Sequence, residues 1–301
     1  MKCKRLFLYL PLTFALTWAV WFWMAANPAN IIVALYPTQL IAATMWIPGI
    51  CAGVTWLVLR KKEPYALPLR FRLRGNGRRY LAAFFVPLLL TIAGALLFFL
   101  LFPARFNDAG LSQIAAQYGA AIGDAVSDAA RTAAGWAALL LNLALAPFIN
   151  TLFALGEELG WRGLMMPALL ERLPAPKAVV VGGVIWGLWH APITALMGHN
   201  YGFRYWGYPV AGIAAMCVFC TASGALLTYV TVKARSVWPA ALAHGAVNAF
   251  ASLPLVFLAV GAPADTMLLG PAPAGLVAGI PAVLCGILYT IRLNKSNGET
   301  T

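Results

Sequence analysis

The feature that most constrains the fold of this chain is a series of long apolar stretches. Each is bounded by charged residues, Gly or Pro, and most reach the length of about 20 residues that an α-helix needs to cross about 30 Å of hydrocarbon. The stretches cover residues 6–27, 38–59, 80–102, 134–170, 178–197, 208–231, 237–260 and 268–291. The sequence therefore predicts an all-α, polytopic transmembrane helical bundle with about eight membrane-spanning helices.

The composition excludes the other broad classes of protein. Hydrophobic residues make up 62% of the chain and charged residues 10%. Soluble domains contain about 45–50% apolar residues and about 25% charged residues. A water-soluble globule and a disordered chain are therefore excluded. The 5 cysteines in 301 residues are too few, and odd in number, for a disulfide scaffold.

The net charge of +12 is explained by membrane topology rather than by nucleic acid binding, because membrane proteins concentrate Lys and Arg in cytoplasmic loops. If the N-terminus is cytoplasmic, all of the 21 basic residues lie in or toward cytoplasmic segments, except Arg105, Arg131 and Arg204. We expect a single integral membrane domain over residues 1–301, in a bacterial inner (cell) membrane, with both termini in the cytoplasm. The lipid bilayer is then a partner of the chain, and nucleic acid is not.

Two carboxylates and an arginine interrupt the fourth apolar stretch: Glu157, Glu158 and Arg162. On insertion scales, placing one charged side chain near the bilayer centre costs about 2.5–3.5 kcal/mol of free energy. Ionisable residues at that depth therefore indicate a function. Glu158 and Arg162 are four residues apart, share a helix face and can pair. The alternative that these residues mark a cytoplasmic helix end is disfavoured, because the apolar sequence continues as far as Glu171.

The fifth and seventh stretches carry polar side chains at a similar depth. His190 follows Trp186 by four residues, and His244 and Asn248 are also four residues apart. With a rise of about 1.5 Å per residue, Glu157 and these three polar residues lie about 14–21 Å from the charged ends of their helices. Polar groups from three helices are thus predicted to meet in one layer of the membrane.

Two kinds of hydrolytic chemistry suit this set of side chains. A carboxylate and an imidazole that converge in an apolar cavity can polarise a water molecule, while a second imidazole and an amide donate to a developing oxyanion. Alternatively, Glu157, His190 and His244 match an ordinary catalytic zinc set, in which the zinc-bound water is the nucleophile. The sequence leaves both possibilities open: no cofactor, or a zinc ion with these three ligands.

The three motifs together resemble those of the CAAX protease and bacteriocin-processing (CPBP, or Abi) family of intramembrane proteases. They read Glu157-Glu158-x-x-x-Arg162, Trp186-x-x-x-His190 and His244-x-x-x-Asn248. The resemblance covers about residues 136–260, which are the expected catalytic core. The second motif of the family usually begins with Phe, where this chain has Trp186.

The resemblance implies an intramembrane protease, a hydrolase of the EC 3.4 class that acts on peptide or protein substrates. Bacterial members are linked to peptide or protein processing and to self-immunity. By the resemblance, Glu157 and His190 activate water, His244 and Asn248 stabilise the oxyanion, and Glu158 and Arg162 support them. Because the family has been described both as glutamate proteases and as metalloproteases, it does not decide between the two chemistries.

Other functions remain as alternatives. One is a noncatalytic immunity or scaffold protein, and another is a proton-coupled transporter of similar topology. A transporter is disfavoured because such proteins are built from repeats, whereas the polar motifs here lie only in the second half of the chain. A serine protease that uses Ser223 with His244 as its base is disfavoured too, because Thr221 replaces the first glycine of the expected Gly-x-Ser-Gly.

Overall fold

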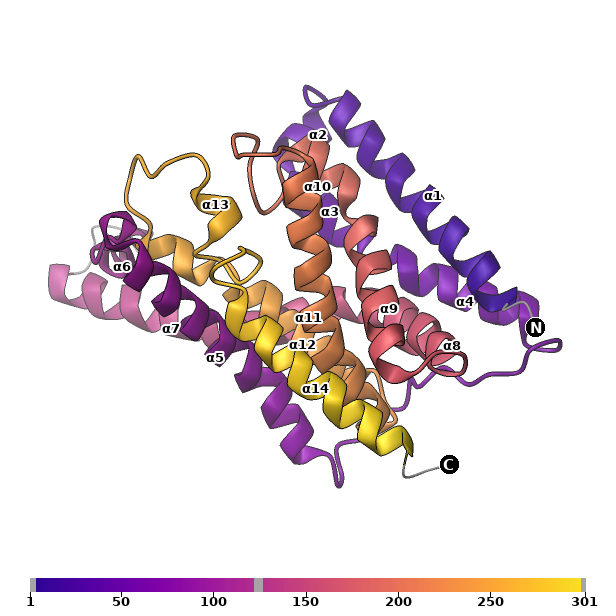
Figure 1. Ribbon diagram of the computed structural model, residues 1–301. Coiled ribbons are helices and arrows are strands. Elements are labelled where there is room, and N and C mark those ends of the chain that lie inside the picture. The colour runs from indigo at the N-terminus through magenta and orange to yellow at the C-terminus, as the bar shows by residue number, and fades with distance from the viewer. Residues whose placement is uncertain (1–3, 122–126, 299–301) are drawn as a thin grey trace.

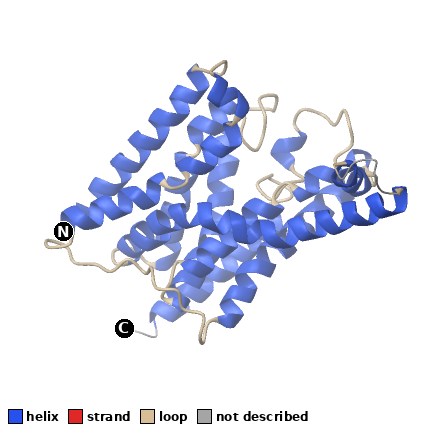
Figure 2. Cartoon of the chain, turned by 180° about the vertical axis from the view of Figure 1, so that it is seen from behind, coloured by secondary structure: helices blue, strands red, loops and turns tan. Residues whose placement is uncertain are grey.

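The computed structural model describes residues 4–121 and 127–298, and this part of the chain folds into a bundle of tilted helices (Figure 1). Figure 2 shows helices and connecting loops, and no strand occurs among the described residues. The predicted all-α class is confirmed.

Seven helical segments within the described ranges are long and apolar enough to cross a membrane. They are α1 (Lys4–Ala26), α3 (Pro37–Thr44) with α4 (Ile47–Leu59), α5 (Gly77–Leu101), α7 (Asp128–Gly160) with η2 (Trp161–Met165) and α8 (Met166–Leu170), α9 (Ala175–Trp189) with α10 (Ala191–Met197), α11 (Val210–Ala234), and α12 (Trp238–Phe250) with η3 (Leu253–Phe257). Each corresponds to one of the first seven apolar stretches. The chain is an integral, multi-pass membrane protein.

The last predicted helix, over 268–291, begins later than expected. α13 covers only Thr266–Leu269, and α14 (Ile280–Gly298) starts after an irregular segment. Pro271 and Pro273 lie in that segment directly after Gly270, and two prolines so close together disfavour a helix, because each lacks a backbone N–H and its ring clashes with the preceding turn. α14 packs against α11 and α9 and completes the bundle. The remaining short elements are α2 (Ile31–Leu35), η1 (Pro103–Arg105) and α6 (Gly110–Ala120).

Two glycines bring helix backbones together near the predicted site. A Cβ atom on Gly156 of α7 would lie 2.6 Å from the carbonyl oxygen of Met45, in the turn between α3 and α4. A Cβ atom on Gly187 of α9 would lie 2.4 Å from the Cα atom of Cys217 on α11. Because carbon contacts are favourable only near 3.5–4.0 Å, any larger residue would push these helices apart. Small residues thus fix the positions of α7 and α9 where they carry the polar side chains.

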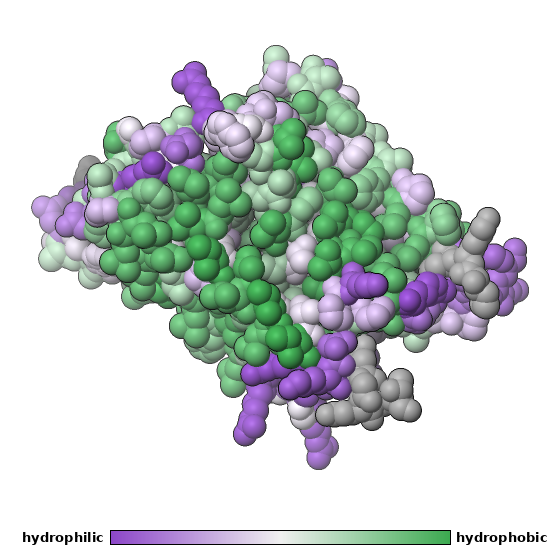
Figure 3. Space-filling view, in the orientation of Figure 1, coloured by the Kyte–Doolittle hydropathy of each residue, from purple (hydrophilic) through white to green (hydrophobic). Residues whose placement is uncertain are grey.

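One end of the bundle is polar and basic. α1 begins and α14 ends toward the lower right of Figure 1, and Figure 3 shows hydrophilic residues along the lower end below a broad apolar face. Arg5 of α1 donates a hydrogen bond of 2.5 Å to Glu171, directly after α8. Partial burial raises the pKa of the Glu171 carboxyl, but the bonds from Arg5 and Arg172 outweigh it and hold this pKa below its usual value. The ion pair ties the first helix to the end of α8.

Candidate active site

Three helices bring four of the predicted residues into one buried layer. Glu157 and Glu158 lie in the last turn of α7, His190 ends α9, and His244 lies in the middle of α12, which packs along α7. Their exposed fractions lie between 0% for Glu158 and 8% for His190. With Arg162 and Trp186, these four residues form what we call the buried cluster.

The helix changes its geometry directly after the two glutamates. Residues Trp161–Met165 form a π-helical turn, all of whose side chains are buried. Pro167 follows in the first turn of α8 and has no N–H to give to the carbonyl one turn earlier. A wider turn before a proline accommodates this missing bond, and π-turns inside helices occur frequently at functional sites. The π-turn carries Arg162 into the cluster.

Glu157 is held by two tryptophans. Its Oε2 atom accepts a hydrogen bond of 3.0 Å from the indole N–H of Trp161 and one of 2.7 Å from that of Trp186. Hydrogen bonds to a carboxylate are stronger than those between neutral groups. They satisfy this oxygen in surroundings where an unpaired charge would be costly. The two bonds fix the orientation of the carboxylate.

Glu158 joins two positively chargeable side chains. Its Oε1 atom accepts a bond of 2.9 Å from Nη1 of Arg162 and lies 2.8 Å from Nδ1 of His244. The predicted pairing of Glu158 with Arg162 is confirmed. The contact with His244 connects α7 to α12 and was not predicted. Because the carboxylate is an acceptor, it fixes Nδ1 of His244 as a donor and leaves Nε2 as the ring nitrogen available for other contacts.

Trp186 is the centre of the cluster. While its N–H binds Glu157, its ring lies 4.2 Å from the guanidinium carbon of Arg162, a cation–π contact. The ring of His244 meets it edge-on at 5.3 Å between centroids. In the sequence, Trp186 is identified only as the aromatic residue that begins the second motif, four residues before His190. A signal for its wider role is the scarcity of polar donors in these helices, since an indole N–H is one of the few donors that an apolar helix can carry.

His190 lies where α9 ends and α10 begins. Its Nδ1 atom is 2.9 Å from the carbonyl oxygen of Trp186, so Nδ1 is the donor and Nε2 remains open as a base. Trp189 meets the imidazole edge-on at 4.7 Å, and Trp21 of α1 stacks on it at 6.4 Å. The aromatic rings hold the imidazole in one orientation within an apolar wall.

Asn248 differs from the other five predicted residues. It lies one turn after His244 on α12, but its side chain is exposed and makes no hydrogen bond among the described residues. The structure therefore does not bring it into contact with the buried cluster. It lies in the last turn of α12, on a side of the helix that is exposed, whereas Phe250 in the same turn is buried.

The serine protease alternative has no support in the geometry. Ser223 lines a small hollow of about 20 Å³ with apolar neighbours that include Leu226 and Val247. No hydrogen bond joins it to His244, whose Nδ1 atom contacts Glu158 instead. In the described part of the chain, Ser223 thus lacks the base that a serine nucleophile requires.

The zinc alternative does not fit the described side chains as they are placed. No group of three or more His, Cys, Asp or Glu residues within the described ranges is arranged to hold a metal ion. Oε2 of Glu157 already accepts two indole N–H bonds. Nδ1 of each histidine is directed at a protein oxygen, which is also the usual arrangement of a metal-bound imidazole, so these bonds do not separate the two chemistries. Because the described side chains form no such group, we derive no chemical step through a metal.

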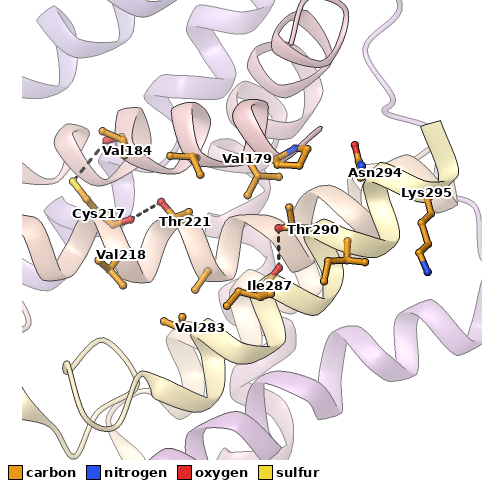
Figure 4. Close-up of a pocket in the computed structure, with 15 residues that line it drawn as sticks. Val179, Val184, Cys217, Val218, Thr221, Val283, Ile287, Thr290, Asn294 and Lys295 are labelled. Carbon is orange, nitrogen blue, oxygen red and sulfur yellow. Dashed lines mark hydrogen bonds between the residues drawn. The ribbon is translucent and has the colours of Figure 1, made fainter. Parts of the chain in front are cut away.

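Two hollows in the bundle differ in whether they reach the cluster. One, of about 260 Å³, reaches Arg162 and extends past Thr228 and Thr231 to Arg235, at the basic end of α11. The other, of about 640 Å³, lies between α9, α11 and α14 and is almost entirely apolar (Figure 4). None of the residues of the cluster lines this second hollow. The smaller hollow is therefore the one that connects the cluster with the basic end of the bundle.

The comparisons with known proteins agree with the motifs. Residues 133–250 match a family model described as type II CAAX prenyl endopeptidase Rce1-like. A CAAX prenyl protease 2 from Methanococcus maripaludis is 28% identical over 102 residues, which are 34% of this chain and 37% of that protein. The match thus spans little more than a third of the length of this relative. All six predicted site residues fall within 133–250, and the family resemblance of this segment is confirmed.

Proposed function

We propose that this protein is an intramembrane endopeptidase that hydrolyses peptide bonds with a water molecule activated by Glu157 and His190. The observation that carries the proposal is the fixed arrangement around Trp186. Its indole N–H orients the carboxylate of Glu157, and its carbonyl oxygen orients the imidazole of His190. A buried carboxylate and imidazole, each locked by the same residue, suit general-base catalysis. The similarity to CAAX proteases supports the same reaction class.

In the first step, the water donates a proton to Glu157 or to Nε2 of His190 while its oxygen attacks the carbonyl carbon of the peptide. The carbonyl π bond opens, and its electron pair becomes the negative charge of a tetrahedral oxyanion. In the second step, the oxyanion re-forms the carbonyl π bond, the C–N bond breaks, and the proton held by the base passes to the leaving nitrogen. The products are a carboxylic acid and an amine. The acid then loses its remaining proton to the amine, which gives a carboxylate and an ammonium group, so the atoms and charges balance.

His244 is suited to stabilise the oxyanion. Since its Nδ1 donates to Glu158, the ring must also carry a proton on Nε2 to donate to substrate. The resulting imidazolium, together with Arg162, balances the charges of Glu157 and Glu158. A neutral set of charges is the least costly one to bury. Asn248 completes the oxyanion site in this proposal only if substrate extends to the exposed last turn of α12.

The substrate is a peptide or protein that is associated with the membrane. We propose that it reaches the cluster through the hollow between Arg162 and Arg235, whose basic end lies on the side assigned to the cytoplasm by the distribution of Lys and Arg. A roughly 260 Å³ hollow accommodates a short stretch of peptide rather than a folded domain. In a bacterial inner membrane, such an enzyme would act in peptide or protein processing or in self-immunity.

Cleavage of a peptide library by the purified chain in detergent tests the proposal. His190→Ala and His244→Ala should each lower turnover by about 10²–10³-fold, because each removes a base or an oxyanion donor. Ser223→Ala should retain wild-type turnover and serves as the control. Product formation is followed by mass spectrometry of the new peptide ends.

Three outcomes would contradict the proposal. Equal turnover by the wild type and both histidine variants would remove the buried cluster from catalysis. If Ser223→Ala loses turnover although its melting temperature equals that of the wild type, a serine nucleophile would be favoured. A wild type that cleaves no member of the library would instead support the noncatalytic alternative.

A further inference from the structure

A basic cavity lies where the start of α5 meets α11 and α14, apart from the buried cluster. It has a volume of about 640 Å³ and is lined by Gly75, Arg78, Arg79, Ala82, Tyr229, Val230, Tyr289 and Arg292. Three of these residues are arginines, contributed by two helices far apart in the sequence, and none is acidic. The start of α5 and the end of α14 lie at the lower end of the bundle, where hydrophilic side chains gather in Figure 3.

The arginines of this cavity are positioned but not neutralised. Nη1 of Arg79 donates to the carbonyl oxygen of Gly75 at 3.2 Å and to Oδ1 of Asn76 at 2.7 Å, which fixes its guanidinium. The guanidinium carbon of Arg292 lies 5.6 Å from the ring centroid of Tyr289. Among the described residues, no ion pair joins Arg78, Arg79 or Arg292 to a carboxylate.

The start of α5 adds to the positive potential. This helix of 25 residues has no acidic residue in its first turn, and the side chain of Asn76 does not cap it. Helix N-termini carry partial positive charge, so Arg78 and Arg79 occupy the end where cations are disfavoured. Arg292 faces the same cavity from α14. Three cations and a helix N-terminus around one hollow repel one another unless an anion lies between them.

We propose that this cavity binds the phosphate-containing headgroup of an anionic phospholipid. Guanidinium groups donate two parallel hydrogen bonds to phosphate oxygens, and the hydroxyls of Tyr229 and Tyr289, whose rings lie 5.0 Å apart, are further donors. Basic pockets between membrane helices on the cytoplasmic side suit such headgroups. Leu81 of α5 and Leu288 of α14 are close in sequence to residues that line the cavity. Both side chains are exposed, and they offer an apolar surface to the acyl chains.

The binding of a fluorescently labelled phosphatidylglycerol to the full chain in a neutral detergent tests this site. An arginine near an anionic lipid surface contributes about 1 kcal/mol, or about fivefold in affinity. Arg292→Gln should therefore weaken binding about fivefold, and the triple variant R78Q/R79Q/R292Q about 100-fold. Arg74→Gln removes one charge from the segment directly before α5, at a residue that does not line the cavity, and this variant should bind like the wild type. Because Arg292→Gln leaves the start of α5 intact, it remains informative if the triple variant fails to fold.

Competition separates lipid from free phosphate. Unlabelled phosphatidylglycerol should displace the probe, whereas phosphatidylcholine and inorganic phosphate should not do so at the same concentration. Displacement by inorganic phosphate with equal affinity would overturn the assignment to a lipid. Wild-type affinity in Arg292→Gln, or equal weakening by Arg74→Gln and Arg292→Gln, would show that charge acts diffusely and would overturn the site itself.

Discussion

Replacing Glu157 by Gln should lower peptide turnover by about 10²–10⁴-fold while the protein remains folded. The amide of Gln has the size of the carboxylate, and its oxygen can accept the bonds that Trp161 and Trp186 now give to Glu157. What the amide cannot do is take a proton from water. The loss therefore reports on general-base catalysis rather than on packing, and it is measured as the initial rate of appearance of new peptide ends.

Glu171→Gln is the matched control for this variant. Glu171 lies on the same helical segment beyond the π-turn and pairs with Arg5 outside the cluster. The same change of charge at this position should leave turnover per folded molecule near that of the wild type. An equal loss in both variants would mean that charge on this segment, not proton transfer at Glu157, determines the rate.

Arg162→Met should lower the free energy of unfolding by about 3–5 kcal/mol, which is the usual effect of removing one partner from a buried ion pair. The side chains of Arg162 and Glu158 are 3% and 0% exposed. Without the guanidinium, the buried carboxylate of Glu158 keeps only His244 as a partner. The free energy of unfolding is measured by titration with a denaturing detergent.

Two further variants separate burial from charge. Arg172→Met removes a pair with Glu171 in which the two side chains are 33% and 47% exposed, so it should change stability by only about 0–1 kcal/mol. The double variant E158Q/R162M removes both charges of the pair, and the side-chain oxygen of the new Gln can still accept the bond from His244. It should be more stable than the sum of the two single changes predicts, because the two sites are coupled. Additive effects, or equal effects of Arg162→Met and Arg172→Met, would contradict the assignment of Glu158 and Arg162 as a coupled, buried ion pair.

The features predicted correctly from the sequence depend on local spacing. The apolar stretches gave seven of the long helices, and the spacing of four residues predicted the pair of Glu158 with Arg162, which is 2.9 Å apart. The last helix was predicted to begin too early. The prediction followed the apolar character of residues 268–291 and did not take account of Pro271 and Pro273. Single prolines lie inside α1, α5 and α7, but two prolines only two residues apart disfavour a helix even within an apolar segment.

The features that were missed depend on how helices cross. The bond from Trp186 to Glu157 spans 29 residues of sequence and the bond from His244 to Glu158 spans 86. No spacing within one helix encodes either contact. The estimate of depth also assumed a continuous α-helix, whereas Trp161–Met165 form a π-turn. Such a turn adds a residue and shifts the following side chains around the axis.

The different environments of His244 and Asn248 have a similar origin. A separation of four residues predicts a common helix face, yet His244 is 5% exposed and Asn248 is exposed to a much greater degree. Four residues advance a helix by about 400°, which is about 40° beyond a full turn. This offset turns Asn248 away from the face that carries His244, whereas Phe250, two residues later, is buried. Which side of α12 its neighbours cover is not specified by the spacing of four residues.

The most direct test of the central claim is single-turnover cleavage of a peptide in water enriched in ¹⁸O, with the protein and the products analysed by intact mass. If a water activated by Glu157 and His190 attacks the peptide directly, the new carboxylate carries one ¹⁸O atom, and the mass of the protein is unchanged at every time point. A protein-bound acyl adduct that forms and decays with the product would contradict this account, as would ¹⁸O incorporation at the wild-type rate in Glu157→Gln.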